Sequence, residues 1–371
     1  MKHKKKIITG LVLIGGIASL LLFFSVGKAK NIYKEVPVTI DIPQMYETNI
    51  VWPVAAKDKK TAGEASGVAV DSKDNIYYLH RATATYGNDE VINKDTVVVL
   101  DAQTKEVRDT WGKGLFKSPH GLEIDSEDNV WITDISQNKI YKFSPEGKLL
   151  DTFGSDYPFY MEAALRIRNV LPKFPTGMDE YTFARPTDVT VLKDGSFVVS
   201  DGYRNRRIVK FDQNGKFIWE KNLLGNKDGE FNLPHGISHD ENGNLYVADR
   251  NNARIQVFDK DGNFLDSWNS KELGRPFGVE VGDDGNVYVA DGGNSLYPEG
   301  GKGSHQVVVL NTKGEVIQRF GSWGENKGQL KIPHDIAVNS KGDIYVAELE
   351  NERLQEFKKK ISYGVGLHSF L

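Results

Sequence analysis

A short strand pattern recurs along the chain and constrains the fold more than any other feature. In its clearest copy, residues 234–237 (Pro-His-Gly-Ile) open a first strand, residues 244–249 form a second, and residues 254–259 form a third. The six copies start at Ala65, Pro119, Pro186, Pro234, Pro276 and Pro333. A unit of roughly 40 residues built from short alternating strands is typical of a propeller blade. The repeat therefore predicts an all-β fold, a six-bladed β-propeller.

Three segments exceed the basic repeat, and we expect them to form insertions: residues 83–95, 155–183 and 292–304. The second of these is expected to include a short helix at 161–170. No linker divides the repeats, so we expect one propeller domain over residues 37–371. A strand at 38–42 would close the ring beside the last blade.

Residues 1–36 are expected to act as a signal-anchor or signal peptide with a short linker. A lysine cluster precedes an uncharged stretch at residues 7–26, which is long enough to span a bilayer as a helix. Positive charge before such a helix places the body outside the cytoplasm. Ser25 and Gly27 are small enough for a cleavage site. We therefore expect an extracytoplasmic protein, held to the membrane by its N-terminal transmembrane helix, or secreted if that helix is cleaved.

The composition excludes several classes of function. The formal net charge is −4, and a lysine-rich N-terminus leaves the remainder of the chain more acidic still. An acidic body is unsuited to binding phosphate backbones, so we expect no nucleic-acid partner. The chain has no cysteine. This rules out disulfides, thiolate zinc sites and cysteine nucleophiles.

Histidines occupy alternate copies of one repeat position. The residue after the opening proline or alanine is, in order, Ser66, His120, Thr187, His235, Phe277 and His334. Alternate blades lie about 120° apart around the axis, so His120, His235 and His334 should point at one spot from three directions. Three imidazoles with an open fourth position are the ligands of a catalytic zinc, although imidazole also suits iron, copper or nickel. The alternative, that Pro-His is only a favoured turn of the repeat, is weakened because three copies lack histidine.

A second set of residues should converge on the same end of the channel. These residues follow the second strands, which return to the end where the first strands begin, and they include Arg81, Tyr203 and Arg250. Arg250 beside a metal could hold a substrate carboxylate in a bidentate fork. Tyr203 could accept a proton if a nearby cation lowers its pKa. The acids that end second strands are expected to be structural: Asp134, Asp201, Asp249 and Asp291.

The repeat resembles the NHL repeat family of six-bladed propellers over roughly residues 60–358. A closer resemblance is to the peptidyl-α-hydroxyglycine α-amidating lyase (peptidylamidoglycolate lyase) family. It rests on these segments: 66–68 with 80–81, 119–122, 185–189, 200–203, 247–250, 254–256 and 333–335. Members of this family cleave a C-terminal α-hydroxyglycine to a peptide amide and glyoxylate. The resemblance therefore implies a carbon–nitrogen lyase acting in peptide amidation, on a small-molecule or peptide substrate with a C-terminal carboxylate.

The same resemblance implies a role for individual residues. The zinc ligands of the family fall on His120, His235 and His334, its active-site tyrosine on Tyr203, and its functional arginines on Arg81 and Arg250. Its structural calcium uses two backbone carbonyls and one carboxylate, which fall on Val68, Leu122 and Asp335. The chain departs from the animal members at Arg204, where they have a cysteine, and at Ile332, where they have a methionine.

A different class of function stays open at this point. NHL-type propellers outside the cytoplasm also act as binding or scaffold proteins without catalysis, and such a protein needs neither an open zinc position nor Tyr203 and Arg250. A lactonase or other hydrolase on a similar propeller is disfavoured, because those families use carboxylate and asparagine ligands. We expect a monomer in either case.

Overall fold

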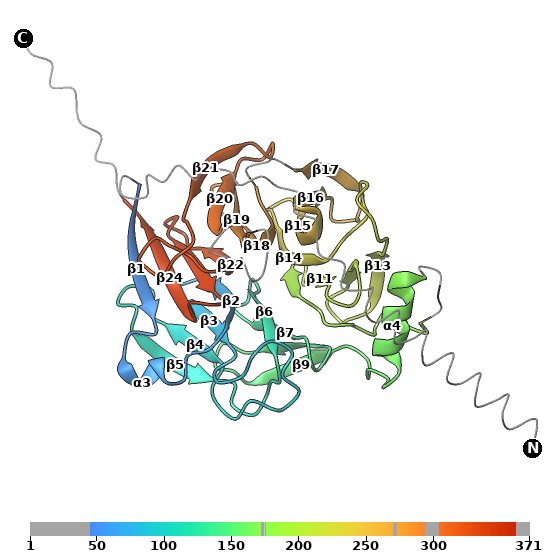
Figure 1. Cartoon of the computed structure of the whole chain (residues 1–371), viewed down its shortest axis with the longest axis horizontal. Coiled ribbons are helices and arrows are strands. Elements are labelled where there is room, and N and C mark those ends of the chain that lie inside the picture. The colour runs from blue at the N-terminus through green and yellow to red at the C-terminus, as the bar shows by residue number, and fades with distance from the viewer. Residues whose placement is uncertain (1–44, 172–173, 175, 270–272, 294–303, 361–371) are drawn as a thin grey trace, which may run out of the picture.

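The computed structural model describes residues 45–171, 174, 176–269, 273–293 and 304–360. Six four-stranded antiparallel sheets surround a central axis (Figure 1). The first strand of each sheet contacts the first strands of both neighbouring sheets, so these strands form the innermost ring. The predicted all-β, six-bladed propeller is confirmed.

Blades one to five take their strands in chain order from the axis outward, and the sixth adds β1 outside its last strand. Blades one to three comprise β2 (Ala65–Val70), β3 (Ile76–His80), β4 (Val97–Leu100) and β5 (Val107–Trp111); β6 (Pro119–Ile124), β7 (Val130–Asp134), β8 (Lys139–Phe143) and β9 (Leu149–Phe153); and β10 (Asp188–Val191), β11 (Phe197–Asp201), β12 (Arg207–Phe211) and β13 (Phe217–Lys221). Blades four to six comprise β14 (Pro234–His239), β15 (Leu245–Asp249), β16 (Arg254–Phe258) and β17 (Phe264–Trp268); β18 (Pro276–Val281), β19 (Val287–Asp291), β20 (Gln306–Leu310) and β21 (Val316–Phe320); and β22 (Pro333–Val338), β23 (Ile344–Glu348), β24 (Arg353–Lys359) and β1 (Tyr46–Trp52).

The ring is closed by a strand from the N-terminal side, as predicted, but at a different place. Strand β1 pairs antiparallel with β24, from Tyr46 opposite Lys359 to Trp52 opposite Leu354. The predicted closing strand at 38–42 lies outside the described residues. The aromatic side chains at both ends of β1 explain the position: the Tyr46 ring packs on Phe320 in β21 of the fifth blade, and Trp52 stacks beside Tyr78 in the first blade. By pairing with β24, strand β1 covers an edge that the last blade would otherwise expose, and each blade keeps only a short outer edge.

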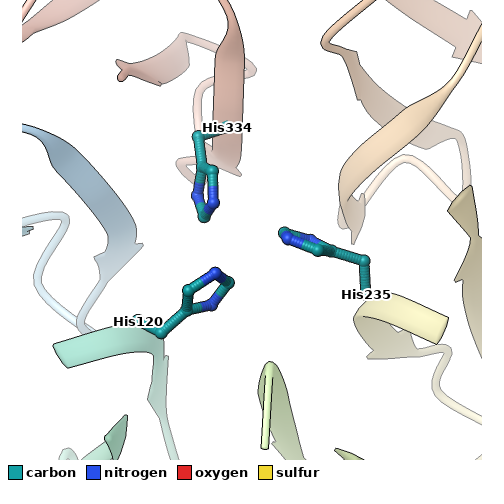
Figure 2. A group of neighbouring side chains, drawn as sticks. All are labelled: His120, His235 and His334. Atoms are coloured by element: carbon teal, nitrogen blue, oxygen red, sulfur yellow. The ribbon is translucent and has the colours of Figure 1, made fainter. Parts of the chain in front are cut away.

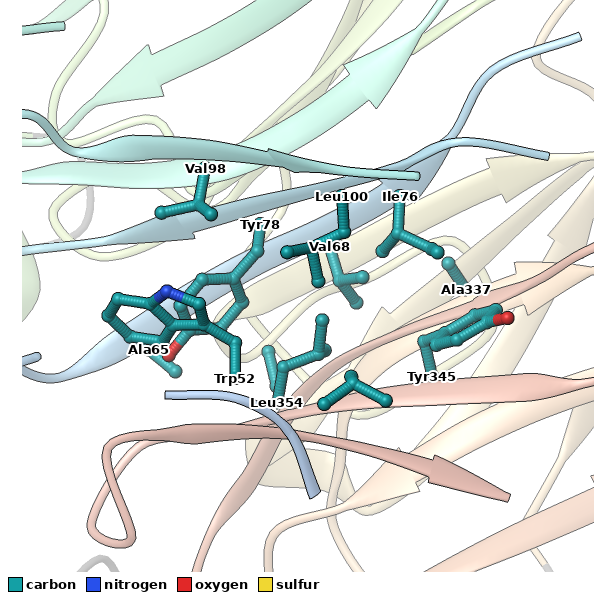
Figure 3. Close-up of a cluster of buried hydrophobic side chains, with 12 residues drawn as sticks. Trp52, Ala65, Val68, Ile76, Tyr78, Val98, Leu100, Ala337, Tyr345 and Leu354 are labelled. Atoms are coloured by element: carbon teal, nitrogen blue, oxygen red, sulfur yellow. The ribbon is translucent and has the colours of Figure 1, made fainter. Parts of the chain in front are cut away.

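The hydrophobic core lies between neighbouring blades. Figure 3 shows the cluster between the last blade and the first, where Trp52 and Leu354 face Val68 and Tyr78. These side chains are almost fully buried. Burial of a large apolar side chain stabilises the fold by about 1.5–3 kcal/mol. Each blade is therefore held by its neighbours, and the ring fixes the innermost strands that carry the site.

Neighbouring innermost strands approach each other too closely for a side chain at every position. A Cβ atom on Gly121 would lie 2.7 Å from the Thr187 carbonyl oxygen, and one on Gly236 would lie 2.7 Å from the Phe277 carbonyl oxygen. These glycines follow His120 and His235 directly. The Pro-His-Gly sequence therefore combines a side chain that points into the channel with a residue that allows the neighbouring strand to approach.

The insertions are only partly described. The helix predicted at 161–170 is present as α4 (Met161–Val170), at the outer edge of the molecule (Figure 1). Two shorter helical turns are α3 (Ala56–Lys59) and η1 (Arg250–Asn252). Most of the insertion predicted at 292–304 and the anchor helix predicted at 7–26 lie outside the described residues. No helix in the described part of the chain is long and apolar enough to cross a membrane.

The acids at the ends of the second strands are structural, as expected. Buried Asp134 accepts hydrogen bonds from the backbone N–H groups of Lys117, Ser118, Ser136 and Gln137. The carboxylates of Asp201, Asp249 and Asp291 accept from Ala184, Asn232 and Arg275 in the same way. Each acid thus ties the loop that enters its blade to the turn that leaves the second strand.

Asp134→Ala should lower the free energy of unfolding by about 3 kcal/mol, because it leaves several backbone donors without an acceptor in a buried place. Urea unfolding followed by tryptophan fluorescence measures the change. Asp261→Ala, at an exposed turn, is the matched control and should have little effect. Equal stability of the two variants would contradict the structural role of Asp134.

Candidate active site

Three histidine rings meet on the axis of the propeller. His120 on β6, His235 on β14 and His334 on β22 point toward one another across the channel (Figure 2). One candidate ligand atom from each ring lies within 4.8 Å of the other two, and all three residues are buried. The structure therefore brings together the three histidines that the repeat register singled out.

Hydrogen bonds fix which nitrogen of each ring faces the centre. Nδ1 of His120 lies 2.7 Å from the Thr187 carbonyl oxygen, and Nδ1 of His235 lies 2.8 Å from that of Phe277. Nδ1 of His334 lies 2.8 Å from the Ser66 carbonyl oxygen. Because a carbonyl can only accept, each Nδ1 carries the hydrogen and each Nε2 keeps a free lone pair.

The three rings are in the form that binds metal. Burial holds the pKa of His120 and of His235 well below the ordinary value, and the neighbouring histidines act in the same direction. Burial likewise lowers the pKa of His334 to about 3. The rings are therefore neutral at physiological pH. Three neutral Nε2 atoms oriented by outer hydrogen bonds fit an ion that prefers imidazole, such as zinc.

Tyr203 lies directly against this nitrogen cluster. Its hydroxyl oxygen is 2.9 Å from Nε2 of His120 and 3.1 Å from Nε2 of His235. Burial raises the pKa of Tyr203 above its ordinary value of 10, while the charges of Arg250 and Arg81 act to lower it. The two arginines thus act in the expected direction, although burial outweighs them among the protein groups.

Two arginines are buried near the same point and keep nitrogen atoms available. Arg81 is fully buried and donates from Nη1 to Glu64 at 3.0 Å, while its Nε and Nη2 have no hydrogen-bond partner in the described part of the chain. Arg250 opens η1 and lies 3.9 Å above the Phe277 ring, and its Nε is also without a partner there. Buried cations with unused donors are costly, so this arrangement suits an anionic ligand.

The residues expected to bind calcium lie toward the opposite mouth of the channel. Val68, Leu122 and Asp335 line one cavity of about 550 Å³ there, together with Asp188 and Glu280. The Asp335 carboxylate accepts a hydrogen bond of 2.9 Å from the Val68 N–H, which links the last blade to the first. Burial raises the pKa of Asp335, and the charge of Asp188 raises it further. Oxygen ligands in this setting suit a hard cation.

Sequence reasoning missed two residues that help to build the site. Glu64 contacts Arg81, as described above, and Tyr86 lies with its ring centroid 5.1 Å from that of Tyr203, at an angle of 70°. Tyr86 belongs to the insertion predicted at 83–95. The position of this insertion in the repeat could have indicated Tyr86. The insertion follows a second strand, and second strands end at the histidine end of the channel.

Comparison with known proteins places the chain in a family. An NHL repeat model matches residues 183–211, 231–258 and 330–357. "Peptidyl-alpha-hydroxyglycine alpha-amidating lyase 2" of Drosophila melanogaster is 30% identical, over 85% of this chain and 75% of that protein. "Peptidyl-glycine alpha-amidating monooxygenase" of Mus musculus is 31% identical over 80% of this chain. The chain belongs to the peptidyl-α-hydroxyglycine α-amidating lyase family.

The chain is shorter than several of its relatives and shares its fold with more distant proteins. The chain spans only 30% of the mouse protein's length and 58% of that of the Drosophila lyase 1. Among solved structures, virginiamycin B lyase from Staphylococcus aureus is 12% identical with a TM-score of 0.55, covering 84% of this chain and 99% of that one. A gluconolactonase from Xanthomonas campestris is also 12% identical, with a TM-score of 0.57, covering 85% and 90%. At such low identity this likeness shows the shared propeller fold.

Zinc binding by this lyase-family chain should require His235 and not His239, which lies on the same strand β14 outside the trio. Loss of an outer partner of a metal ligand costs about 10- to 100-fold in affinity, so His235→Ala should cost more. Calorimetric titration of zinc into the metal-stripped protein measures this. His239→Ala should bind as the parent does. Retention of the parent's affinity by His235→Ala would contradict the three-histidine site.

Proposed function

We propose that the protein is a zinc-dependent lyase that cleaves the carbinolamide C–N bond of a C-terminal α-hydroxyglycine, releasing a peptide amide and glyoxylate. The observation that carries the proposal is the meeting of three histidine rings, two of which present Nε2 within hydrogen-bond distance of the Tyr203 hydroxyl. Family membership supports the same reaction. A propeller that only binds a partner would not require three histidines beside a buried tyrosine hydroxyl.

His120, His235 and His334 would hold the metal through Nε2. Three imidazole nitrogens are the protein donor set of a catalytic zinc, and the Tyr203 hydroxyl lies beside two of them. When bound, zinc supplies a Lewis acid that lowers the pKa of a hydroxyl group at this point. The carbonyls of Ser66, Thr187 and Phe277 keep the rings aimed at the centre.

Tyr203 is placed to move the proton of the reaction. In its phenolate form, which the charges of Arg250 and Arg81 favour, its oxygen accepts the proton of the substrate's carbinol hydroxyl and becomes the phenol. The electron pair of that O–H bond forms the C=O bond of glyoxylate. The C–N bond breaks, and its electron pair stays on the amide nitrogen. The nitrogen then takes up one proton, which the Tyr203 phenol can return, so the phenolate is restored.

Arg250 and Arg81 are placed to bind the substrate carboxylate. Both are buried and both keep nitrogens available. Charge-assisted hydrogen bonds to a carboxylate would satisfy those nitrogens and fix the α-carbon beside Tyr203. Glu64 holds the Arg81 guanidinium from one side, so Arg81 is oriented before the substrate arrives.

Calcium belongs to the proposal as a structural ion. It would take the backbone carbonyls of Val68 and Leu122 and the carboxylate of Asp335, which come from three adjacent innermost strands. A cation there would offset the carboxylates of Asp188 and Glu280 in the same cavity. Elemental analysis of the purified protein for calcium tests this assignment.

The setting of the enzyme is also a proposal. The lysine cluster and uncharged stretch of residues 1–36 support an extracytoplasmic enzyme, membrane-anchored or secreted after cleavage. Its partner would be a peptide or small molecule with a C-terminal carboxylate. We propose a monomer without a nucleic-acid partner.

Tyr203→Phe should lower the rate of glyoxylate release from an N-acylated peptide ending in α-hydroxyglycine by about 10²- to 10⁴-fold, because the proton acceptor is lost. Zinc content, measured on the same preparation, should stay the same. Tyr160→Phe, on an exposed tyrosine, is the matched control. An unchanged rate in Tyr203→Phe would remove the proton-transfer role, and no release by the parent would overturn the proposed reaction.

Arg250→Ala should selectively lower kcat/KM for substrates that carry a carboxylate. Its kcat/KM for the α-hydroxyglycine peptide should fall about thirtyfold or more, since a buried charged contact is lost. An analogue with a carboxamide in place of the carboxylate should lose much less. Arg166→Ala, on the exposed face of α4, is the control. Equal losses on both substrates would mean that Arg250 does not bind the carboxylate.

A further inference from the structure

One exposed aromatic ring stands at the entrance to the site. Tyr86 is 44% exposed, although its ring meets that of Tyr203 edge to face. The guanidinium carbon of Arg81 lies 5.8 Å from the centre of the Tyr86 ring. Tyr86 therefore touches both a group proposed to transfer the proton and one proposed to bind the carboxylate, while the rest of its surface faces solvent.

The segment that carries Tyr86 is held in place. Glu64 accepts a hydrogen bond of 2.7 Å from the Tyr86 backbone N–H with the same oxygen that contacts Arg81. The next residue, Gly87, donates its N–H to the Ser118 hydroxyl at 3.1 Å. A ring fixed in this way can contact a ligand without first losing backbone freedom, which favours binding.

The charged groups near this entrance help to fix the Tyr86 side chain. Arg185 and Arg204 share the Glu162 carboxylate on α4, at 3.2 and 2.8 Å. Arg185 also hydrogen-bonds to the Tyr86 hydroxyl. The carbon atoms of the Tyr86 ring are thus the apolar surface of this part of the entrance, and an apolar or aromatic group of a ligand packs well on them.

We infer that Tyr86 determines specificity by contacting the side chain of the substrate residue that precedes the α-hydroxyglycine. This inference rests on the proposed function. The hydroxyl and carboxylate of the substrate have buried partners in Tyr203, Arg81 and Arg250, so the acyl side must leave toward solvent. Because Tyr86 packs on Tyr203 and is itself exposed, the peptide leaves past this ring. Enzymes with this geometry should prefer apolar residues before the hydroxyglycine.

The test compares two substrates that differ only in the residue before the α-hydroxyglycine. These are N-acetyl-Phe-α-hydroxyglycine and N-acetyl-Gly-α-hydroxyglycine, and glyoxylate release gives kcat and KM for each. The parent should prefer the Phe substrate. Tyr86→Ala should reduce that preference about three- to tenfold, mainly through KM, because an aromatic contact is lost. Tyr86→Phe keeps the ring and should keep the preference.

Controls separate this inference from a structural role and from the proposed function. Tyr160→Ala removes a tyrosine of similar exposure, 48%, from the other insertion, and should leave the preference unchanged. Zinc content and circular dichroism check folding, and Tyr86→Leu replaces Tyr86→Ala if that variant does not fold. A preference unchanged in the variant, or an equal fall in kcat on both substrates, overturns the specificity role alone. Failure of the parent to release glyoxylate from either substrate overturns the proposed function and this inference together.

Discussion

Hydrogen bonds between histidine rings and the carbonyls of neighbouring blades set the chemistry of the channel. Each of the three Nδ1 atoms bonds to the residue at the corresponding position of an adjacent blade: Ser66, Thr187 or Phe277. The blades without histidine therefore supply the acceptors, and the blades with histidine supply the rings. This division uses all six copies of one repeat position. It works only while the ring of blades is closed, because His334 on the last blade depends on Ser66 of the first.

Closure in turn links the site to the chain's N-terminal side. The pairing of β1 with β24 completes the last blade, and the Trp52 side chain packs against the first. A second link between the same blades is the hydrogen bond from the Val68 N–H to Asp335. Asp188 repeats this arrangement by accepting from the Ile237 N–H of the next blade. Two carboxylates in equivalent positions thus join innermost strands just beyond the histidines, at the cost of placing acidic groups in a buried channel.

The parts of the site that follow the repeat register could be predicted from sequence, and the other parts could not. His120 and Tyr203 occupy positions whose place on a blade is the same in every copy, so counting along the repeat brings them to one end of the channel. Glu64 and Tyr86 have no such register: one precedes its repeat and the other lies in an insertion. Their meeting with Arg81 depends on the path of a loop. The raised pKa of Tyr203 could not be predicted from the sequence for a related reason. Burial causes it, and burial is a property of the assembled ring of blades and not of the local sequence.

The contrast between residues at repeat positions and residues outside the repeat corresponds to a contrast between the proposed chemistry of the protein and its proposed selectivity. Groups proposed to act on the reacting atoms come from repeat positions, which the fold holds rigidly around the axis. Groups inferred to meet the remainder of the substrate come from insertions: Tyr86 follows the first blade's second strand, and Glu162 on α4 fixes Arg185 and Arg204 at the same entrance. An insertion can change in length and composition without disturbing the ring, because its ends are anchored to blades that are already packed. Propellers with the same three histidines but different insertions should therefore share a reaction and differ in the peptides they accept.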